Sequence, residues 1–83
     1  MKVDELKKTI YQTLKEIAPD TEPSNLRDEE NIQETLYIDS YDALQFIVAL
    51  DERLGVEIPE QDYGKVKSIK DLILYLKTKI KIT

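Results

Sequence analysis

Apolar residues recur at helical spacing in three segments of this 83-residue chain, and this pattern limits the possible folds more than any other feature. In the first segment the apolar residues are Val3, Leu6, Ile10, Leu14 and Ile17. Their spacing of three or four residues puts these side chains on one face of an amphipathic helix. Because Pro19 disfavours helical geometry in the residue before it, the pattern predicts a helix over residues 2–17.

The second segment opens with Asp39-Ser40 and closes at Leu54-Gly55. We expect Asp39 to cap the start of this helix and Asp42 to reach back to it, as in a capping box with an acid at both positions. Gly55 fits a left-handed C-terminal cap. The apolar stripe is Leu44, Ile47, Leu50 and Leu54, and the adjoining, more exposed face is Tyr41, Gln45, Val48 and Glu52.

Residues 19–39, between these two helices, lack helical periodicity and are rich in turn and cap residues, so we expect a long ordered loop. Leu26, Ile32 and Leu36 recur along it, which predicts that the loop is pinned across the core. A loop of this length is unusual in a small domain and needs an architectural or functional reason.

The third segment starts at Ser68, an N-cap residue with Asp71 at the reciprocal position. Its apolar residues are Ile69, Leu72, Ile73, Leu76 and Ile80. Residues 60–66, just before it, suit one turn or a short helix. The tail, residues 79–83, alternates like a strand but has no second strand to pair with, so we interpret it as a fraying helix end. Together these elements predict an all-α fold, a small four-helix bundle of three main helices and one short helix, in one domain spanning residues 1–83.

The chain contains no histidine and no cysteine, which removes the usual general base and the usual nucleophilic thiol. We therefore expect no catalytic residue and no metal site, and an enzyme is the weakest interpretation. No apolar run approaches the roughly 20 residues of a membrane span, and the N-terminus lacks the apolar stretch of a signal peptide. These features predict a cytoplasmic protein. We also expect it to be a monomer.

Charge is distributed unevenly along the chain. Residues 28–62 hold eleven acidic and one basic side chain, whereas residues 63–83 hold one acidic and six basic. The acidic middle segment would repel a phosphate backbone, so nucleic acid is not an expected partner. It would attract a basic protein surface.

Ser40 places a hydroxyl at a helix N-terminus, beside unpaired N–H groups and the positive end of the helix dipole, which suits an attached phosphate. In this setting the sequence resembles the acyl carrier protein family: short, acidic four-helix bundles that carry 4′-phosphopantetheine on the serine of an Asp-Ser-Leu motif at the start of the second helix. The resemblance is strongest from Leu36 to Leu76. Asp39-Ser40 is similar to the attachment dipeptide, ALQFIVALDERLGVEIP to the recognition helix, and VKSIKDLILYL to the last helix.

This resemblance implies that Ser40 is an attachment point and not a catalyst, with Asp39 as a second cofactor-binding residue. A phosphopantetheinyl transferase would supply the arm from coenzyme A, and the arm would hold acyl intermediates as thioesters for a lipid, fatty-acid or polyketide-type pathway. Other implied partners are an acyl-loading ligase and acyltransferase or synthase enzymes with basic patches. Expected partner contacts are Tyr41, Asp42, Gln45, Val48, Asp51 and Glu52. Expected acyl-pocket residues, each also suited to an ordinary core position, are Leu44, Phe46, Ile47, Leu50, Val66, Ile69 and Ile73.

Three departures from the family pattern surround the serine. Tyr41 follows it where leucine is usual, Tyr37-Ile38 precede Asp39 where glycine and a small or apolar residue are common, and Gln45 replaces a frequent glutamate. These departures favour a specialised stand-alone carrier over a carrier that serves the general fatty-acid synthase. Two alternatives stay open: a peptidyl or aryl carrier of a nonribosomal system, and a helical adaptor in which Ser40 is a helix cap or a phosphorylation site.

Overall fold

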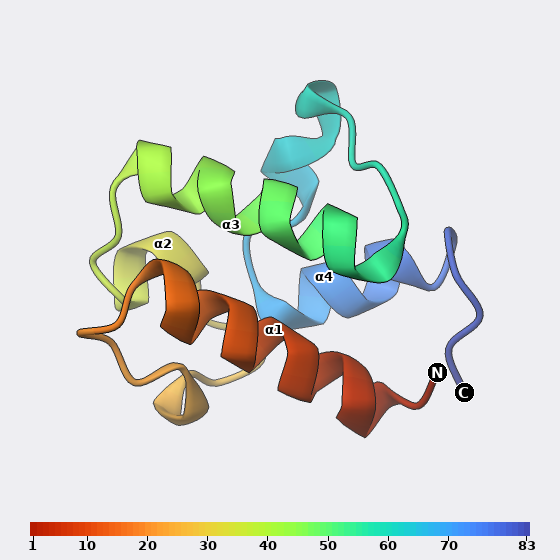
Figure 1. Ribbon diagram of the computed structural model, residues 1–83, viewed down its shortest axis with the longest axis horizontal. Helices are drawn as coiled ribbons and strands as arrows, with labels where there is room; N and C mark the ends of the chain where they lie inside the picture. The colour runs from red at the N-terminus through yellow and green to blue at the C-terminus, as the bar shows by residue number, and fades with distance from the viewer.

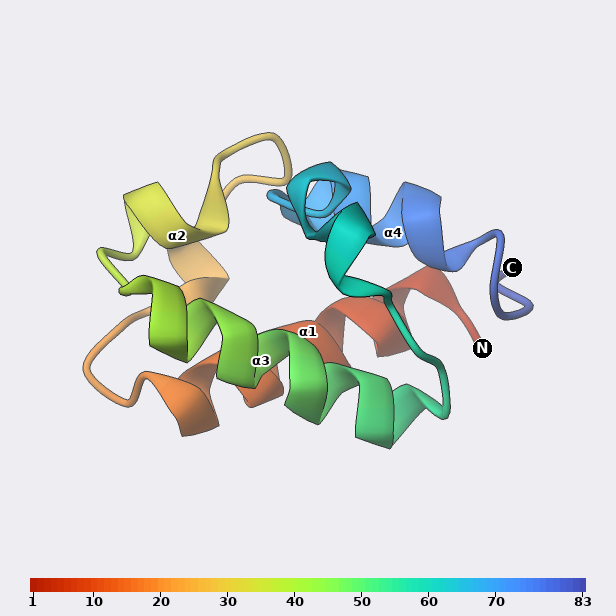
Figure 2. The ribbon, with the colours of Figure 1, turned by 90° about the horizontal axis from the view of Figure 1, so that it is seen from above.

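The computed structural model describes residues 1–83 and contains helices but no strands. The α-helices are α1 (Val3–Ile17), α2 (Ile32–Thr35), α3 (Ser40–Leu54) and α4 (Ile69–Leu76), and the 3-10 helices are η1 (Pro23–Asn25) and η2 (Glu60–Lys65). α1 and α3 pack side by side (Figure 1), and α1 also contacts α4. Seen from above, α2 and α4 lie on one side of the α1–α3 pair (Figure 2). The predicted all-α bundle with three main helices is confirmed.

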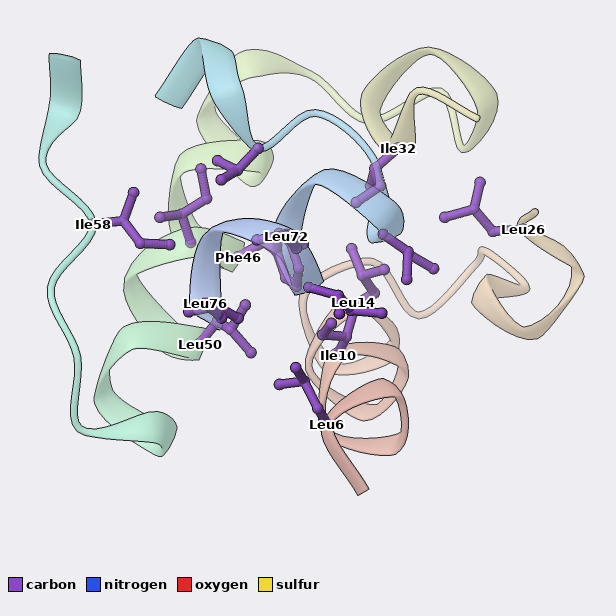
Figure 3. Close-up of a cluster of buried hydrophobic side chains, with 14 of the residues drawn as sticks. Leu6, Ile10, Leu14, Leu26, Ile32, Phe46, Leu50, Ile58, Leu72 and Leu76 are labelled. Atoms are coloured by element: carbon purple, nitrogen blue, oxygen red, sulfur yellow. The ribbon is translucent and has the colours of Figure 1, made fainter. Parts of the chain in front are cut away.

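The core of the bundle is one cluster of 16 buried apolar residues. In Figure 3, Leu6, Ile10 and Leu14 point from α1 toward Leu50 of α3 and Leu76 of α4. These five side chains have no exposed surface. All five come from the predicted apolar stripes, which correctly place most of the buried faces. In α3 the prediction is wrong at two positions, since Leu44 of the stripe is 40 % exposed and Phe46, outside the stripe, is buried.

Caps define the ends of α3 and α4. The Asp39 carboxylate accepts a hydrogen bond of 2.8 Å from the Asp42 N–H, and Gly55 closes α3 with a φ of 66°. Ser68 accepts a hydrogen bond of 3.0 Å from the Asp71 N–H. The predicted return bond from the Asp42 side chain to Asp39 is absent, because aspartate is one methylene shorter than the glutamate that closes a capping box.

The predicted long loop between α1 and α3 is wrong in one respect, since it contains η1 and the short helix α2. Asn31 caps α2 by accepting a hydrogen bond of 2.8 Å from the Glu34 N–H. Leu26 and Ile32 are buried, so the segment is pinned across the core as expected. The Ile32 N–H also donates to the Lys67 carbonyl at 2.8 Å, which ties α2 to the segment before α4.

The C-terminal tail also differs from the prediction. α4 ends at Leu76, and the last residues are not a fraying helix but run back beside the N-terminus. The Thr83 N–H donates to the Met1 carbonyl at 2.9 Å, and the Val3 N–H donates to the Thr83 carbonyl at 3.3 Å. The two chain ends accordingly lie together in both ribbon views (Figures 1 and 2). The tail therefore does have a partner for its backbone hydrogen bonds, namely the first residues of the chain.

Candidate cofactor-attachment site

Ser40 is the first residue of α3, and its side chain is exposed to solvent. Asp39 caps the helix from the preceding position, so its carboxylate points at the N–H groups of the first turn. On the other side, the Gln33 amide of the segment containing α2 donates a hydrogen bond of 3.4 Å to the Ser40 hydroxyl oxygen. The hydroxyl is therefore held between two elements while remaining open to a reaction partner.

An apolar pocket of about 270 Å³ opens beside this serine. Its lining residues come from α2, α3 and the η2 region: Ile32, Gln33, Ser40, Ala43, Leu44, Phe46, Ile47, Tyr63, Gly64, Val66 and Lys67. Seven of the eleven are hydrophobic, so the pocket can accept an apolar group that enters next to Ser40.

The structure brings together four of the seven predicted pocket residues and separates the other three. Leu44, Phe46, Ile47 and Val66 line the pocket with Ser40. Leu50, Ile69 and Ile73 do not line it and belong to the buried core instead. Leu44 is 40 % exposed, because it stands where the pocket meets the surface.

Sequence reasoning missed several residues of the pocket wall. Ala43 was within reach of prediction, because it lies three residues after Ser40 on the same face of the helix. Ile32 and Tyr63 approach from segments far apart in sequence, and no local pattern connects them with Ser40. Among the wall residues, Gln33 is the one that contacts the serine hydroxyl.

The predicted partner-contact residues on α3 fall into two groups. Tyr41, Val48 and Glu52 are exposed, with Tyr41 67 % and Val48 41 % accessible, whereas Asp42 and Gln45 are half-buried. The exposed members form a strip that starts next to Ser40 and continues along the helix. This strip is acidic and apolar at once.

Asp51 has a structural role that the sequence did not indicate. Its Oδ2 accepts a hydrogen bond of 3.0 Å from the Ile58 N–H, which holds the segment after α3 against the helix. Its Oδ1 is buried without a hydrogen-bond partner. Burial raises the pKa of Asp51, the Ile58 N–H opposes that shift, and Glu57 adds to it.

Tyr37, which was not among the predicted contact residues, has the most unusual backbone near the site. Its φ is 55°, in the left-handed region that costs a bulky residue on the order of 1 kcal/mol. Glycine adopts a positive φ without a steric penalty, so this conformation fits the glycine that the resemblance leads us to expect at this position. The Tyr37 side chain is 94 % exposed.

No group of three or more potential metal-ligating side chains occurs in the structure. None of the helices is both long enough and apolar enough to cross a lipid bilayer.

Comparison with known proteins agrees with this geometry. Residues 6–76 match the family described as "Phosphopantetheine attachment site". The acyl carrier protein of Thermosynechococcus vestitus is 32% identical over 74 residues, covering 86% of this chain and 91% of that protein. The acyl carrier protein of Campylobacter fetus is 36% identical over 73 residues, covering 88% of each. A solved structure of the acyl carrier protein from Enterococcus faecalis superimposes with a TM-score of 0.72 at 24% identity, covering 96% of this chain and 100% of that one, and shows the same fold.

The match to the phosphopantetheine-attachment family over residues 6–76 defines a carrier of a covalently attached group, and the helical fold agrees with it. The chain belongs to the phosphopantetheine-attachment family that includes the acyl carrier proteins. Its role is that of an acyl carrier and not a catalyst, and its cofactor is 4′-phosphopantetheine.

Proposed function

We propose that Ser40 is the attachment residue and that this chain carries acyl groups as thioesters between enzymes of a lipid, fatty-acid or polyketide-type pathway. One observation carries the proposal: Ser40 is exposed at the start of α3 and also lines the mouth of an apolar pocket. A group attached to its Oγ can turn outward to an enzyme or inward to the pocket.

In the modification step, Ser40 Oγ forms a new bond to phosphorus and the adenosine bisphosphate part of coenzyme A leaves. The hydroxyl proton passes to a general base on the transferase. The attached arm supplies the thiol that the chain lacks. Gln33, whose amide already donates to Ser40 Oγ, can donate to a phosphate oxygen at the same place.

The pocket provides a resting place for the carried acyl group. Its walls are mainly aliphatic, and branched apolar side chains repack at a small cost when a flexible chain enters. Leu44, Ile47 and Val66 lie on the wall and can contact such a chain without disturbing a buried polar group.

The exposed strip on α3 is the proposed contact surface for partner enzymes, namely the phosphopantetheinyl transferase, an acyl-loading ligase and acyltransferase or synthase enzymes. Tyr41 and Val48 offer apolar contact, and Glu52 offers an exposed charge to basic patches. The half-buried Asp42, beside the strip, adds a second charge. Contacts between exposed charges steer the encounter but remain weak, which suits a carrier that must be released. We expect partner binding to weaken steeply as salt concentration rises; binding that does not depend on salt would contradict this surface.

The direct test is intact-mass measurement after incubation with coenzyme A, Mg²⁺ and a broad-specificity phosphopantetheinyl transferase. The wild-type chain should gain the mass of one phosphopantetheinyl group and the Ser40→Ala variant should gain nothing. The matched control is Ser24→Ala, which removes an exposed serine from η1 and should be modified like wild type. An unmodified wild type, or a modified Ser40→Ala variant, would refute the assignment.

A further inference from the structure

Tyr37, near Ser40, has a strained backbone, and packing of its side chain does not offset the strain. Its φ of 55° is unfavourable for a tyrosine, yet the side chain is 94 % exposed and packs against almost nothing in the chain. Glycine would adopt the same backbone without strain. A bulky ring exposed in this way is available for contact with another molecule.

Tyr37 is one of the residues that line an open hollow of about 280 Å³ between the end of α2 and the connection that follows α1. The hollow is lined by Asp20, Thr21, Glu22, Asn25, Leu26, Thr35, Leu36 and Tyr37. Most of these side chains are polar, and two are carboxylates. The hollow is thus distinct from the apolar pocket beside Ser40.

The charge around the hollow favours a cation. Two carboxylates, those of Asp20 and Glu22, line the hollow, and no basic side chain does. Glu22 is paired with Lys15 at 3.2 Å, and the same ammonium donates to the Thr21 carbonyl at 2.7 Å. Asp20 is exposed and has no ion pair, so its charge is free to attract a basic group from another molecule.

We propose that Tyr37 and Asp20 form a binding site for an arginine side chain of the phosphopantetheinyl transferase. A guanidinium can lie flat on a tyrosine ring while its N–H groups pair with a carboxylate, which an ammonium cannot do equally well. Tyr37 precedes Ser40 by only three residues, so an enzyme that reaches the serine is also beside the ring. Docking then extends from α3 onto the α1–α2 connection. This inference rests on the proposed modification of Ser40.

Transferase kinetics test the inference, with coenzyme A, Mg²⁺ and the carrier concentration varied. Tyr37→Gly, which removes the ring and suits the backbone, should raise KM for the carrier about tenfold with kcat unchanged. Tyr37→Asn, which also tolerates a positive φ, should behave alike. Asp20→Asn should raise KM about threefold. The matched control is Leu74→Ala, which removes a 54 % exposed apolar side chain from α4 and should leave KM unchanged.

A second measurement tests the chemistry of the site without an enzyme. In an NMR titration with N-acetyl-arginine amide, resonances of Tyr37 and Asp20 should shift, and N-acetyl-lysine amide should shift them less. Equal KM values for wild type and Tyr37→Gly would overturn the inference, as would shifts of equal size with the two probes. If wild type gains no mass at all, the assignment of Ser40 has failed instead, so the two failures are distinguishable.

Discussion

The two ends of α3 are built in opposite ways. At the C-terminal end, Gly55 closes the helix and the Asp51 carboxylate binds the Ile58 N–H at 3.0 Å. Arg53 reaches α1, where its Nη1 donates to the hydroxyl of the fully buried Thr13 at 2.9 Å. Its Nη2 forms an ion pair with Glu16. This end is tied to its surroundings by hydrogen bonds from both backbone and side chains.

At the N-terminal end the ties are few. Asp39 caps the helix, Gln33 donates to Ser40 Oγ over 3.4 Å, and Tyr37 is both strained and exposed. The contrast teaches that α3 is held from its buried face and its far end, which leaves the end carrying Ser40 open to other proteins. Substitutions should therefore change stability at one end and modification at the other.

The largest effect is expected where α3 is anchored in the core. Leu50 has no exposed surface, so Leu50→Ala should lower the free energy of unfolding by about 3 kcal/mol through lost burial and the cavity left behind. Urea denaturation would measure the loss. The matched control is Val48→Ala on the 41 % exposed strip, which should cost about 0.5 kcal/mol or less. Equal losses would contradict the division of the helix into an anchored and an open face.

The next effect concerns the link from the C-terminal end of α3 to α1. Arg53→Ala should lower the free energy of unfolding by about 1 kcal/mol, because the buried Thr13 hydroxyl loses a charged donor. Lys15→Ala is the control, since it breaks the exposed pair with Glu22 and should change stability very little. Urea denaturation of both variants checks this, and a larger loss for Lys15→Ala would show that the anchoring bond is misidentified.

At the open end the expected change has the opposite sign. Tyr37→Gly should raise the free energy of unfolding by about 0.5 kcal/mol, since relief at a φ of 55° outweighs the greater freedom of glycine in the unfolded chain. Gly55→Ala, at a φ of 66° on the other end of α3, is the matched control and should be destabilising. Thermal unfolding would compare them. A destabilised Tyr37→Gly variant would mean that the ring supports the fold.

Many of the core and pocket residues on the helices could be predicted from the sequence. The stripes of α1, α3 and α4 are local, so periodicity correctly assigned Leu6, Leu50 and Leu72 to the core. Ser40, Leu44 and Ile47 share a helix face and could be placed at one pocket for the same reason.

What escaped prediction depends on contacts between distant segments. α2 is four residues long, and its first N–H donates to the Lys67 carbonyl, so the tertiary contact stabilises it more than its own sequence does. The tail pairs with Met1 and Val3, and the Asp51 carboxylate binds the Ile58 N–H across a turn. No local pattern marks these partners, because each pairing is decided only when the bundle closes.

The smallest effect near neutral pH is expected beside the anchored end, where Tyr75 of α4 donates a hydrogen bond of 2.6 Å to Asp62 of η2. This bond raises the pKa of Tyr75 from 10.0 to about 12 and lowers the pKa of Asp62. A phenol with a raised folded-state pKa stabilises the protein fully below pH 10.0, and the contribution is lost as pH rises through about 12. The Asp62 carboxylate contributes above its ordinary pKa of 3.8, and this part is lost as pH falls through the lowered value.

Tyr75→Phe should therefore be less stable than wild type at pH 8, and the two free energies of unfolding should converge toward pH 12 and again in acid. Urea denaturation across this range measures the difference, and phenolate absorbance follows the titration of the tyrosines. Tyr11→Phe is the control, because Tyr11 packs against the core and its hydroxyl donates no hydrogen bond. A wild-type advantage that stays constant through pH 12 would show that the hydroxyl of Tyr75 does not hold η2 against α4.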